Sequence, residues 1–182
     1  MNTATKNLEN DHVNILRLID VVEKMILVKS TNTEHFEKTV NLIKSYADGF
    51  HHAKEENLLF PMMVKKGYSI EQGPIAVMLH DHVQGRNYVK GMTDGIASYK
   101  KGNEAALAKI YENMQGYIIL LRSHIAKENN VLFRMADNAL SENDQQELLT
   151  AFAIVEKSNF CIGVLNDSIT AIDKLESAYR EL

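Results

Sequence analysis

Cysteine and proline are scarce in this chain of 182 residues, which has one cysteine and two prolines. The single cysteine, Cys161, has no partner for an internal disulfide, which fits a reducing compartment and makes the cytoplasm the expected location. Glycine is also sparse, with nine residues. Because proline and glycine interrupt helices, their scarcity beside abundant Leu, Ile, Met, Ala, Glu and Lys favours helices over a sheet.

Basic clusters and long apolar runs are missing too. The formal net charge is −4 and no basic run occurs, so neither nucleic acid nor an anionic membrane surface is an expected partner. No stretch is apolar for long enough to cross a bilayer, and the amino terminus lacks the apolar core of a secretory signal. There is neither a Gly-x-Ser-x-Gly elbow nor a glycine-rich phosphate loop, so no catalytic residue is nominated.

The remaining composition is that of an ordinary globular protein. Hydrophobic residues make up 45% of the chain and charged residues 24%, enough for a sizeable core in one domain over 1–182. Short loops between long helices make neighbours antiparallel, which predicts an all-α fold: an up-down four-helix bundle over about 5–137 with a fifth helix packed alongside. Periodicity and punctuation place the five helices at about 5–29, 34–66, 70–101, 103–137 and 141–179.

The first two predicted helices resemble the next two. An Asp-His-Val segment occurs at 11–13 and again at 81–83, an offset of 70 residues, and a His-x-x-x-Glu step occurs at 51–55 and again at 124–128, an offset of 73 residues. The unit occurs only twice, so it indicates a two-fold repeat of helical hairpins and not a solenoid.

The His-x-x-x-Glu step has the spacing of a metal-ligand pair. Positions i and i+4 of an α-helix lie about 40° apart and one turn along, so an imidazole and a carboxylate can reach the same ion. In the second helix an apolar stripe runs into His51 and Glu55. The register of His52 and Glu56 follows Asp48 and other polar residues, so His51 and Glu55 are the pair expected to face inward.

One histidine continues the apolar stripe of each of the other three helices. His12 heads the stripe of the first helix, and His124 with Glu128 continues that of the fourth. The third helix carries two histidines two residues apart, which a helix places about 160° from each other, so only one can face a given site. His82 has more apolar neighbours at helical spacing than His80 and is the one expected to face inward.

A lone histidine on an apolar face is more often a hydrogen-bonded core residue than a metal ligand. An inward glutamate is different, because an unpartnered carboxylate is costly to bury, and Lys54 and Lys127 point away from the two glutamates that they precede. The symmetric set is therefore predicted to bind metal. Its members are His12, His51, Glu55, His82, His124 and Glu128, and the weaker candidates are His52, Glu56 and His80.

The segments at 9–12, 51–61, 79–82 and 124–128 together resemble those of the hemerythrin-like, or HHE cation-binding, family. The resemblance covers about 11–136. It implies an up-down bundle around a non-haem di-iron centre. In that centre the terminal ligands would be His12, His51, His82 and His124, and the bridging carboxylates Glu55 and Glu128.

The cofactor that the resemblance implies is a pair of iron ions, Fe²⁺ or Fe³⁺, with or without an oxo or hydroxo bridge. The donor set agrees independently, because mixed imidazole and carboxylate ligands suit iron, manganese or zinc, whereas calcium and magnesium prefer all-oxygen sites. Bridging carboxylates can hold two ions about 3.5–4 Å apart.

The set departs from the family in one respect. Oxygen-carrying hemerythrins use a fifth histidine, which the inward faces do not supply. Either His80 or His52 completes the set by local distortion, or the centre keeps extra open positions. A set of four histidines and two glutamates resembles that of di-iron proteins that repair iron centres after nitrosative stress, so reaction with small ligands or iron handling is favoured over simple oxygen transport.

Three functions are compatible with these residues. The first is a di-iron protein that binds or reacts with O₂, NO or peroxide in a stress response, with a redox partner protein. The second is an iron store or donor without turnover, and the third is an interaction bundle stabilised by metal. The sequence leaves open whether the protein is an enzyme and what its oligomeric state is.

Overall fold

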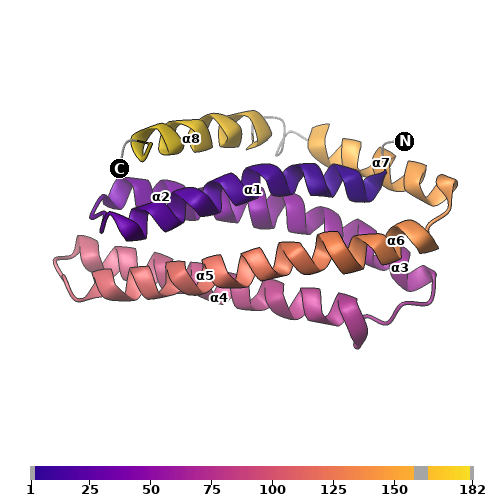
Figure 1. The fold of residues 1–182 in the computed structure, drawn as a ribbon, viewed down its shortest axis with the longest axis horizontal. Helices are drawn as coiled ribbons and strands as arrows, with labels where there is room; N and C mark the ends of the chain where they lie inside the picture. Colours follow the sequence, from indigo (N-terminus) through magenta and orange to yellow (C-terminus); the bar gives the residue numbers. More distant parts are fainter. Residues whose placement is uncertain (1–2, 158–163, 181–182) are drawn as a thin grey trace.

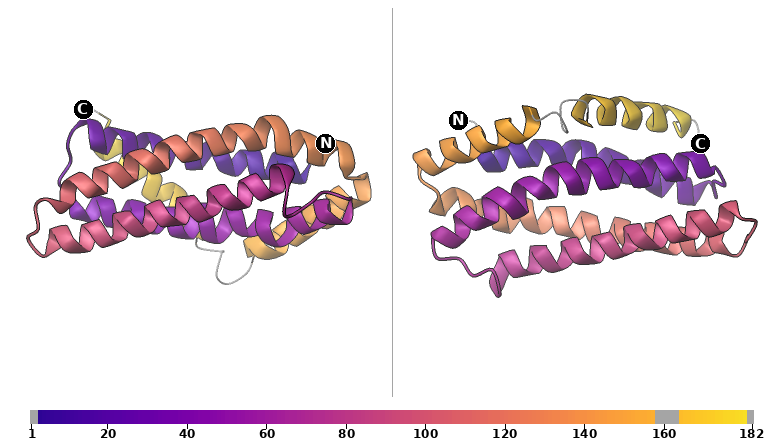
Figure 2. Two further views of the ribbon diagram at one scale, coloured as in Figure 1. Left: turned by 90° about the horizontal axis from the view of Figure 1, so that it is seen from below. Right: turned by 180° about the vertical axis from the view of Figure 1, so that it is seen from behind.

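The computed structural model describes residues 3–157 and 164–180, and every regular element in these ranges is helical. Four long helical rods lie side by side, and two shorter helices, α7 and α8, lie along one side of them, against the first rod (Figure 1). The two further views show the same arrangement (Figure 2). The predicted all-α bundle is thereby confirmed, as are its up-down connections through short loops.

The first rod is α1, Ala4–Leu27. Its N-cap is Thr3, whose side chain accepts a hydrogen bond from the backbone N–H of Lys6. The helix ends two residues before the predicted boundary because Lys29 adopts a φ of 51°, which lies in the left-handed region and turns the chain towards the second rod.

The second rod is continuous but changes its helix type along its length. It comprises α2 (Thr33–Leu42), the π-helical segments η1 (Ile43–His52) and η2 (Glu55–Leu59), and α3 (Phe60–Lys65). The π-helix is rare and mostly occurs as single turns, frequently at functional sites. Here it occupies the stretch that contains the first His-x-x-x-Glu step.

The third rod is α4, Gly73–Lys100. It begins three residues later than predicted, because Gly73 adopts a φ of 73° and Pro74 occupies the first turn, where its missing N–H costs nothing. The fourth rod contains a third π-helical segment near its end. Its parts are α5 (Ala106–Lys127), η3 (Glu128–Leu132) and α6 (Phe133–Ala139).

The predicted fifth helix, over 141–179, is described in two parts. These are α7 (Glu142–Lys157) and α8 (Val164–Ala178), and the link between them, with Cys161, lies outside the described residues. Side-chain contacts fix α8 against α1: the Arg17 guanidinium lies 2.6 Å from both Asp173 Oδ1 and Glu176 Oε2.

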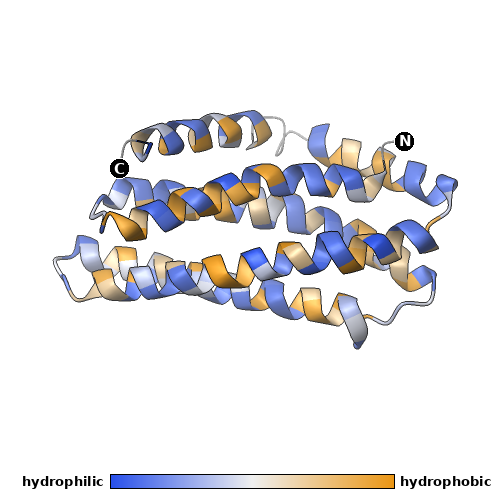
Figure 3. Ribbon diagram, in the orientation of Figure 1, coloured by the Kyte–Doolittle hydropathy of each residue, from blue (hydrophilic) through white to orange (hydrophobic). Residues whose placement is uncertain are grey.

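Two apolar clusters fill the bundle, one on either side of the predicted ligands. The larger cluster contains Ile15 and Ile19 from α1, and the smaller contains Leu8 from the same helix, so His12 lies between the two. Each of the other three rods also contributes residues to both clusters. Apolar and polar residues alternate around the helices in Figure 3, as expected for amphipathic helices that share a core. Within the described residues, no helix combines the length and the apolar character that crossing a bilayer requires.

Candidate metal centre

Between the two apolar clusters, the four rods bring seven potential metal ligands together. Their side chains fall into two groups, and within each group the potential ligand atoms lie within 4.8 Å of one another. All seven residues are buried. The first group consists of His12, His51, Glu55 and Glu128, and the second group of His52, Glu55, His82 and His124.

In the first group the two imidazoles point their Nε2 atoms at each other. His12 Nε2 lies 3.0 Å from His51 Nε2 and 3.2 Å from Glu128 Oε2. His51 Nε2 lies 3.6 Å from Glu55 Oε1. Three different rods therefore supply the first group, and one carboxylate oxygen from each glutamate faces it.

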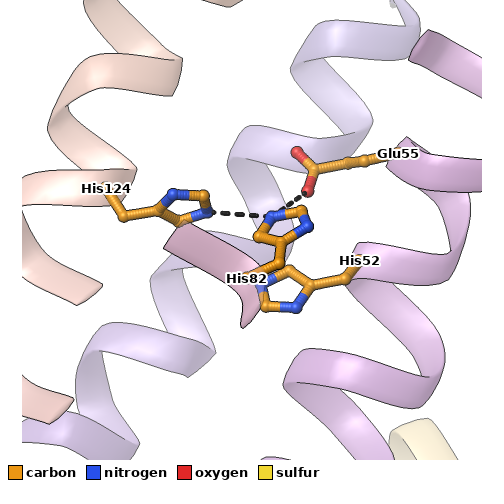
Figure 4. Close-up of side chains that lie close together, drawn as sticks. All are labelled: His52, Glu55, His82 and His124. Carbon is orange, nitrogen blue, oxygen red and sulfur yellow. Dashed lines mark hydrogen bonds and ion pairs between the residues drawn. The ribbon is translucent and has the colours of Figure 1, made fainter. Parts of the chain in front are cut away.

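In the second group three imidazoles converge (Figure 4). His82 Nε2 lies 3.2 Å from His124 Nε2 and 3.5 Å from Glu55 Oε2. The ring of His52 stacks on that of His82, with their centroids 3.8 Å apart. Glu128 faces this group too, since its Oε1 lies 3.1 Å from His124 Nε2.

Each glutamate therefore spans both groups, with one oxygen turned to each. All four carboxylate oxygens of Glu55 and Glu128 are buried, and no hydrogen-bond partner for them is found in the described part of the chain. Buried polar groups of folded proteins are nearly always satisfied, and a buried carboxylate without a partner is costly. The donor set of imidazole nitrogens and shared carboxylate oxygens fits two divalent transition-metal ions.

Every histidine of the two groups directs its other ring nitrogen, Nδ1, at a side-chain oxygen. Such partners fix the orientation of an imidazole and keep Nε2 turned to the metal. A carboxylate only accepts hydrogen bonds, so Nδ1 carries the proton where its partner is an aspartate or a glutamate. The pairs are His12–Asn129 (2.8 Å), His51–Asp11 (3.2 Å), His52–Asp48 (3.3 Å), His82–Glu56 (2.6 Å) and His124–Asp81 (3.4 Å).

The protonation states follow from burial and from the mutual charges. Burial lowers the pKa of His51 to about 4 and that of His52 to about 3, so both are neutral near pH 7. Burial and the charge of Glu128 raise the pKa of Glu55. Burial alone would raise the pKa of Glu128, but the neighbouring His124 and His12 lower it below its usual value. The negative charge of Glu128 in turn outweighs burial at His124 and raises the pKa of that histidine to about 9. Metal ions would displace the protons held in this way.

The position of His52 corrects the prediction that its register faces a polar side. Its exposed fraction is 7%, and it lies in the second group beside His82. The prediction assumed α-helical spacing, whereas His51 and His52 end the π-helical segment η1. Hydrogen bonds of a π-helix run from i to i+5, so a turn takes more residues and adjacent side chains lie closer in angle. Both histidines can therefore face the core, and five histidines are present instead of four.

The two remaining weaker candidates lie outside both groups. His80 is exposed and belongs to neither group. Glu56 is half-buried and accepts hydrogen bonds from His82 Nδ1 and, at 2.8 Å, from Arg86. Its position is that of an orienting partner for His82.

Sequence reasoning missed the other oxygen partners of the histidines, although one signal for two of them was present. The repeated Asp-His-Val segment places Asp11 and Asp81 directly before His12 and His82, yet each aspartate contacts the histidine of the neighbouring rod. No comparable signal marked Asn129, which occupies the repeat position of Glu56.

Two lysines extend this network symmetrically. Lys54 contacts Asp11, and Lys127 contacts Asp81, so each points to an orienting aspartate and away from the adjacent glutamate. The two differ in burial, because Glu156 of α7 lies 3.2 Å from the ammonium of Lys54. The Lys54 side chain has no exposed surface, whereas that of Lys127 is 38% exposed.

Comparison with known proteins agrees with this geometry. Residues 3–136 match the family described as hemerythrin HHE cation-binding domain. Three curated relatives, each named iron-sulfur cluster repair protein YtfE, are 36% identical over 89 residues; they come from Pectobacterium atrosepticum, Pectobacterium carotovorum subsp. carotovorum and Musicola paradisiaca. The matched region is 47% of this chain and 40% of each relative, so the chain matches well under half of their length. No solved structure matches the chain.

Proposed function

Because the chain belongs to the hemerythrin HHE cation-binding family, we propose that its bundle holds two iron ions, one in each ligand group. With iron bound, the protein would bind or react with a small ligand such as O₂, NO or peroxide, in a stress response or in iron handling. Bound iron would supply redox chemistry that the protein side chains lack. The protein holds the ions, orients the imidazoles through their Nδ1 partners and keeps bulk water away from the site.

The buried oxygens of Glu55 and Glu128, which lie between the imidazoles and have no hydrogen bond within the described residues, are the observation that carries this proposal. Two buried carboxylates between two sets of imidazoles would destabilise the bundle if nothing neutralised them. Glu55 and Glu128 would help to hold the two cations, whose charge would neutralise both carboxylates. The mixed nitrogen and oxygen set is typical of iron, manganese or zinc, and the family membership favours a transition metal over calcium or magnesium.

The position of His52 makes oxygen binding a stronger candidate than the sequence alone suggested. A count of four histidines argues against the reversible oxygen chemistry of five-histidine hemerythrins, but five histidines lie in the two groups. The proposed activities therefore include reversible binding of a diatomic ligand as well as chemical reaction with it.

Metal analysis tests the binding part of the proposal. We expect protein from iron-replete cells to contain two iron ions per chain, and metal-free protein to take up two equivalents of Fe²⁺ under anaerobic conditions. Glu128→Gln should lose at least one of them, because the amide presents only one oxygen. His80→Gln, whose side chain is exposed, is the matched control and should bind as the wild type does. Uptake of two equivalents by both variants would rule out the proposed ligand set.

Absorption spectroscopy separates the small-ligand activity from iron donation. Iron-loaded protein should change its absorption when anaerobic samples are exposed to air or to NO. Donation is the second candidate because the curated relatives are named for iron-sulfur cluster repair. It predicts instead that iron passes to a metal-free acceptor protein without such a change. If neither an absorption change nor transfer is observed, a structural role for the metal is favoured.

A further inference from the structure

A cavity of about 220 Å³ lies beside the second ligand group, between η1 and α4. Its lining includes the rings of His52 and His82, the side chain of Arg86 near the surface, and Tyr117, which reaches it from α5. One water molecule takes up about 30 Å³ of the liquid, so the cavity has room for more than a diatomic molecule.

The internal repeat shows that this cavity is a local departure from the rest of the bundle. Gly85 lines the cavity, and its counterpart 70 residues earlier is Ile15, which is 2% exposed. His52 has the apolar counterpart Ile125, 73 residues later. Two positions that are glycine or histidine beside the cavity are therefore isoleucine in the other half of the repeat.

Tyr117 places an unused hydrogen-bond donor at the cavity. Its side chain is only 3% exposed, and no hydrogen bond to its hydroxyl is found within residues 3–157 or 164–180. Burial raises the pKa of Tyr117 above its usual value, so the phenol keeps its proton at neutral pH. Gly85 leaves the ring accessible, since a Cβ atom there would lie 3.6 Å from Tyr117 Cε2.

Most of the charged side chains of the lining are in ion pairs, and the remaining cation, Lys44, is exposed and donates to Thr93 Oγ1 at 3.1 Å. The Arg86 guanidinium lies 2.6 Å from Asp48 Oδ1 and 2.8 Å from Glu56 Oε1. Lys90 lies 2.6 Å from Asp94, at the exposed rim. Because Arg86 and Lys90 have acidic partners and Lys44 is exposed to solvent, the buried part of the lining favours neither an anion nor a cation.

We propose that this cavity binds a small uncharged molecule through a hydrogen-bond acceptor, and that the Tyr117 hydroxyl donates to that acceptor beside His52 and His82. The inference rests on the proposed metal centre, because the bound molecule would lie next to two of its histidines. Tyr117 is then a positioning residue for the ligand, and Gly85 provides the space in which the ligand sits.

Binding can be tested on zinc-loaded protein, which is diamagnetic and has no redox chemistry. The probe is cyclopentanone, an uncharged ring with one carbonyl acceptor, and the comparison compound is cyclopentanecarboxylate, which carries a charge. In an NMR titration, cyclopentanone should shift the amide signals of Gly85 and Val89 with millimolar affinity, the range expected of so small a ligand. The carboxylate should bind at least about tenfold more weakly, since desolvating its charge is not repaid.

Four variants locate the binding. Tyr117→Phe, which removes only the hydroxyl, should weaken cyclopentanone binding about fivefold, the usual effect of one hydrogen bond. Gly85→Ile fills the cavity as Ile15 does in the other half and should abolish the localised shifts. Gly85→Ala meets only ordinary van der Waals contacts and should change the affinity less than about twofold. Tyr111→Phe, a tyrosine of the same helix outside the cavity lining, should leave it unchanged.

The proposal is overturned if cyclopentanone shifts no signal around the cavity, if Gly85→Ile binds it as well as the wild type, or if Tyr117→Phe does not weaken it. Tighter binding of the carboxylate would assign the cavity to anions and would also overturn it. Zinc content is measured in each sample. Protein that lacks zinc contradicts the metal centre, whereas failure of binding in zinc-loaded protein contradicts only the cavity proposal.

Discussion

The ammonium group of Lys54 lies 2.6 Å from the carboxylate of Asp11, in the interior of the protein. Asp11 also accepts from His51 Nδ1, so the lysine stabilises the residue that orients a proposed metal ligand. The repeat supplies a matched pair at Lys127 and Asp81, which is partly exposed. The two pairs differ mainly in burial, because α7 covers Lys54 and does not cover Lys127.

Replacement of Lys54 should therefore be much more damaging than replacement of Lys127. Removing one partner of a buried ion pair typically costs about 3–5 kcal/mol, whereas a partly exposed pair contributes about 0–1 kcal/mol. We expect Lys54→Met to lower the free energy of unfolding by about 3 kcal/mol, and Lys127→Met by less than about 1 kcal/mol, in urea titrations monitored by circular dichroism. Equal losses in the two variants would contradict the role assigned to the cover by α7.

The partners of the imidazoles should control metal affinity without contacting the metal. Asp81→Asn removes the carboxylate that faces His124 Nδ1, and loss of such a partner typically weakens metal binding by about 10–100-fold. Competition with a chromophoric chelator measures the affinity for zinc. Asp94→Asn is the control, because Asp94 lies on the same helix and forms an ion pair with the exposed Lys90. A parallel loss in the control would point to a general charge effect.

His52 should prove to be a ligand, although α-helical spacing places it on the polar side. We expect His52→Ala to weaken the binding of one of two zinc equivalents by at least about tenfold, because the second group would lose one of its three imidazoles. Isothermal titration resolves the two equivalents. His80→Ala should show two unchanged equivalents, since His80 is exposed. Unchanged binding by the His52 variant would restore the four-histidine set.

The metal-free protein should become more stable when Glu55 is neutralised. Burial, with the charge of Glu128 adding to it, raises the pKa of Glu55 above the value of 4.5 expected in the unfolded chain. The unfolded chain therefore releases this proton at lower pH than the folded protein, and the folded state loses stability as the pH rises above about 4.5.

Glu55→Gln removes this pH dependence, because glutamine does not titrate. With a chelator present, we expect the variant to exceed the wild type by roughly 1–3 kcal/mol at pH 8, and by less at pH 4.5. Urea unfolding at the two pH values measures the difference. Glu147→Gln, an exposed residue of α7, should show no such trend. A gap that shrinks as the pH rises would reverse the assigned direction.

Most of the fold could be predicted because each rod shows a clear hydrophobic period bounded by loop residues. The errors have local causes. The start of α4 depends on the φ of Gly73, and the end of α1 depends on the φ of Lys29. Neither left-handed turn is encoded by the spacing of apolar residues.

Helical spacing places six of the seven residues of the two groups on inward faces, and His52 is the exception. His12, His82 and His124 lie on α-helices whose stripes identify their inward faces, and all three lie in the two ligand groups. His52 ends a π-helical segment, where a period of 3.6 residues assigns the wrong face. The cavity could not be predicted because it depends on Gly85. A glycine on a helix does not change the pattern of apolar residues from which the inward face is predicted.

The π-helical segments make the ligand-bearing rods sensitive to the number of residues that they contain. η1 lies between the apolar stripe of α2 and the first His-x-x-x-Glu step. Deleting one residue between Ile43 and His51 would let this stretch wind as an ordinary α-helix. Since one residue corresponds to a rotation of about 100°, the ligands would then turn relative to the stripe that anchors the rod. Over generations, gains and losses of residues should therefore accumulate in the loops that join the rods and be eliminated from η1.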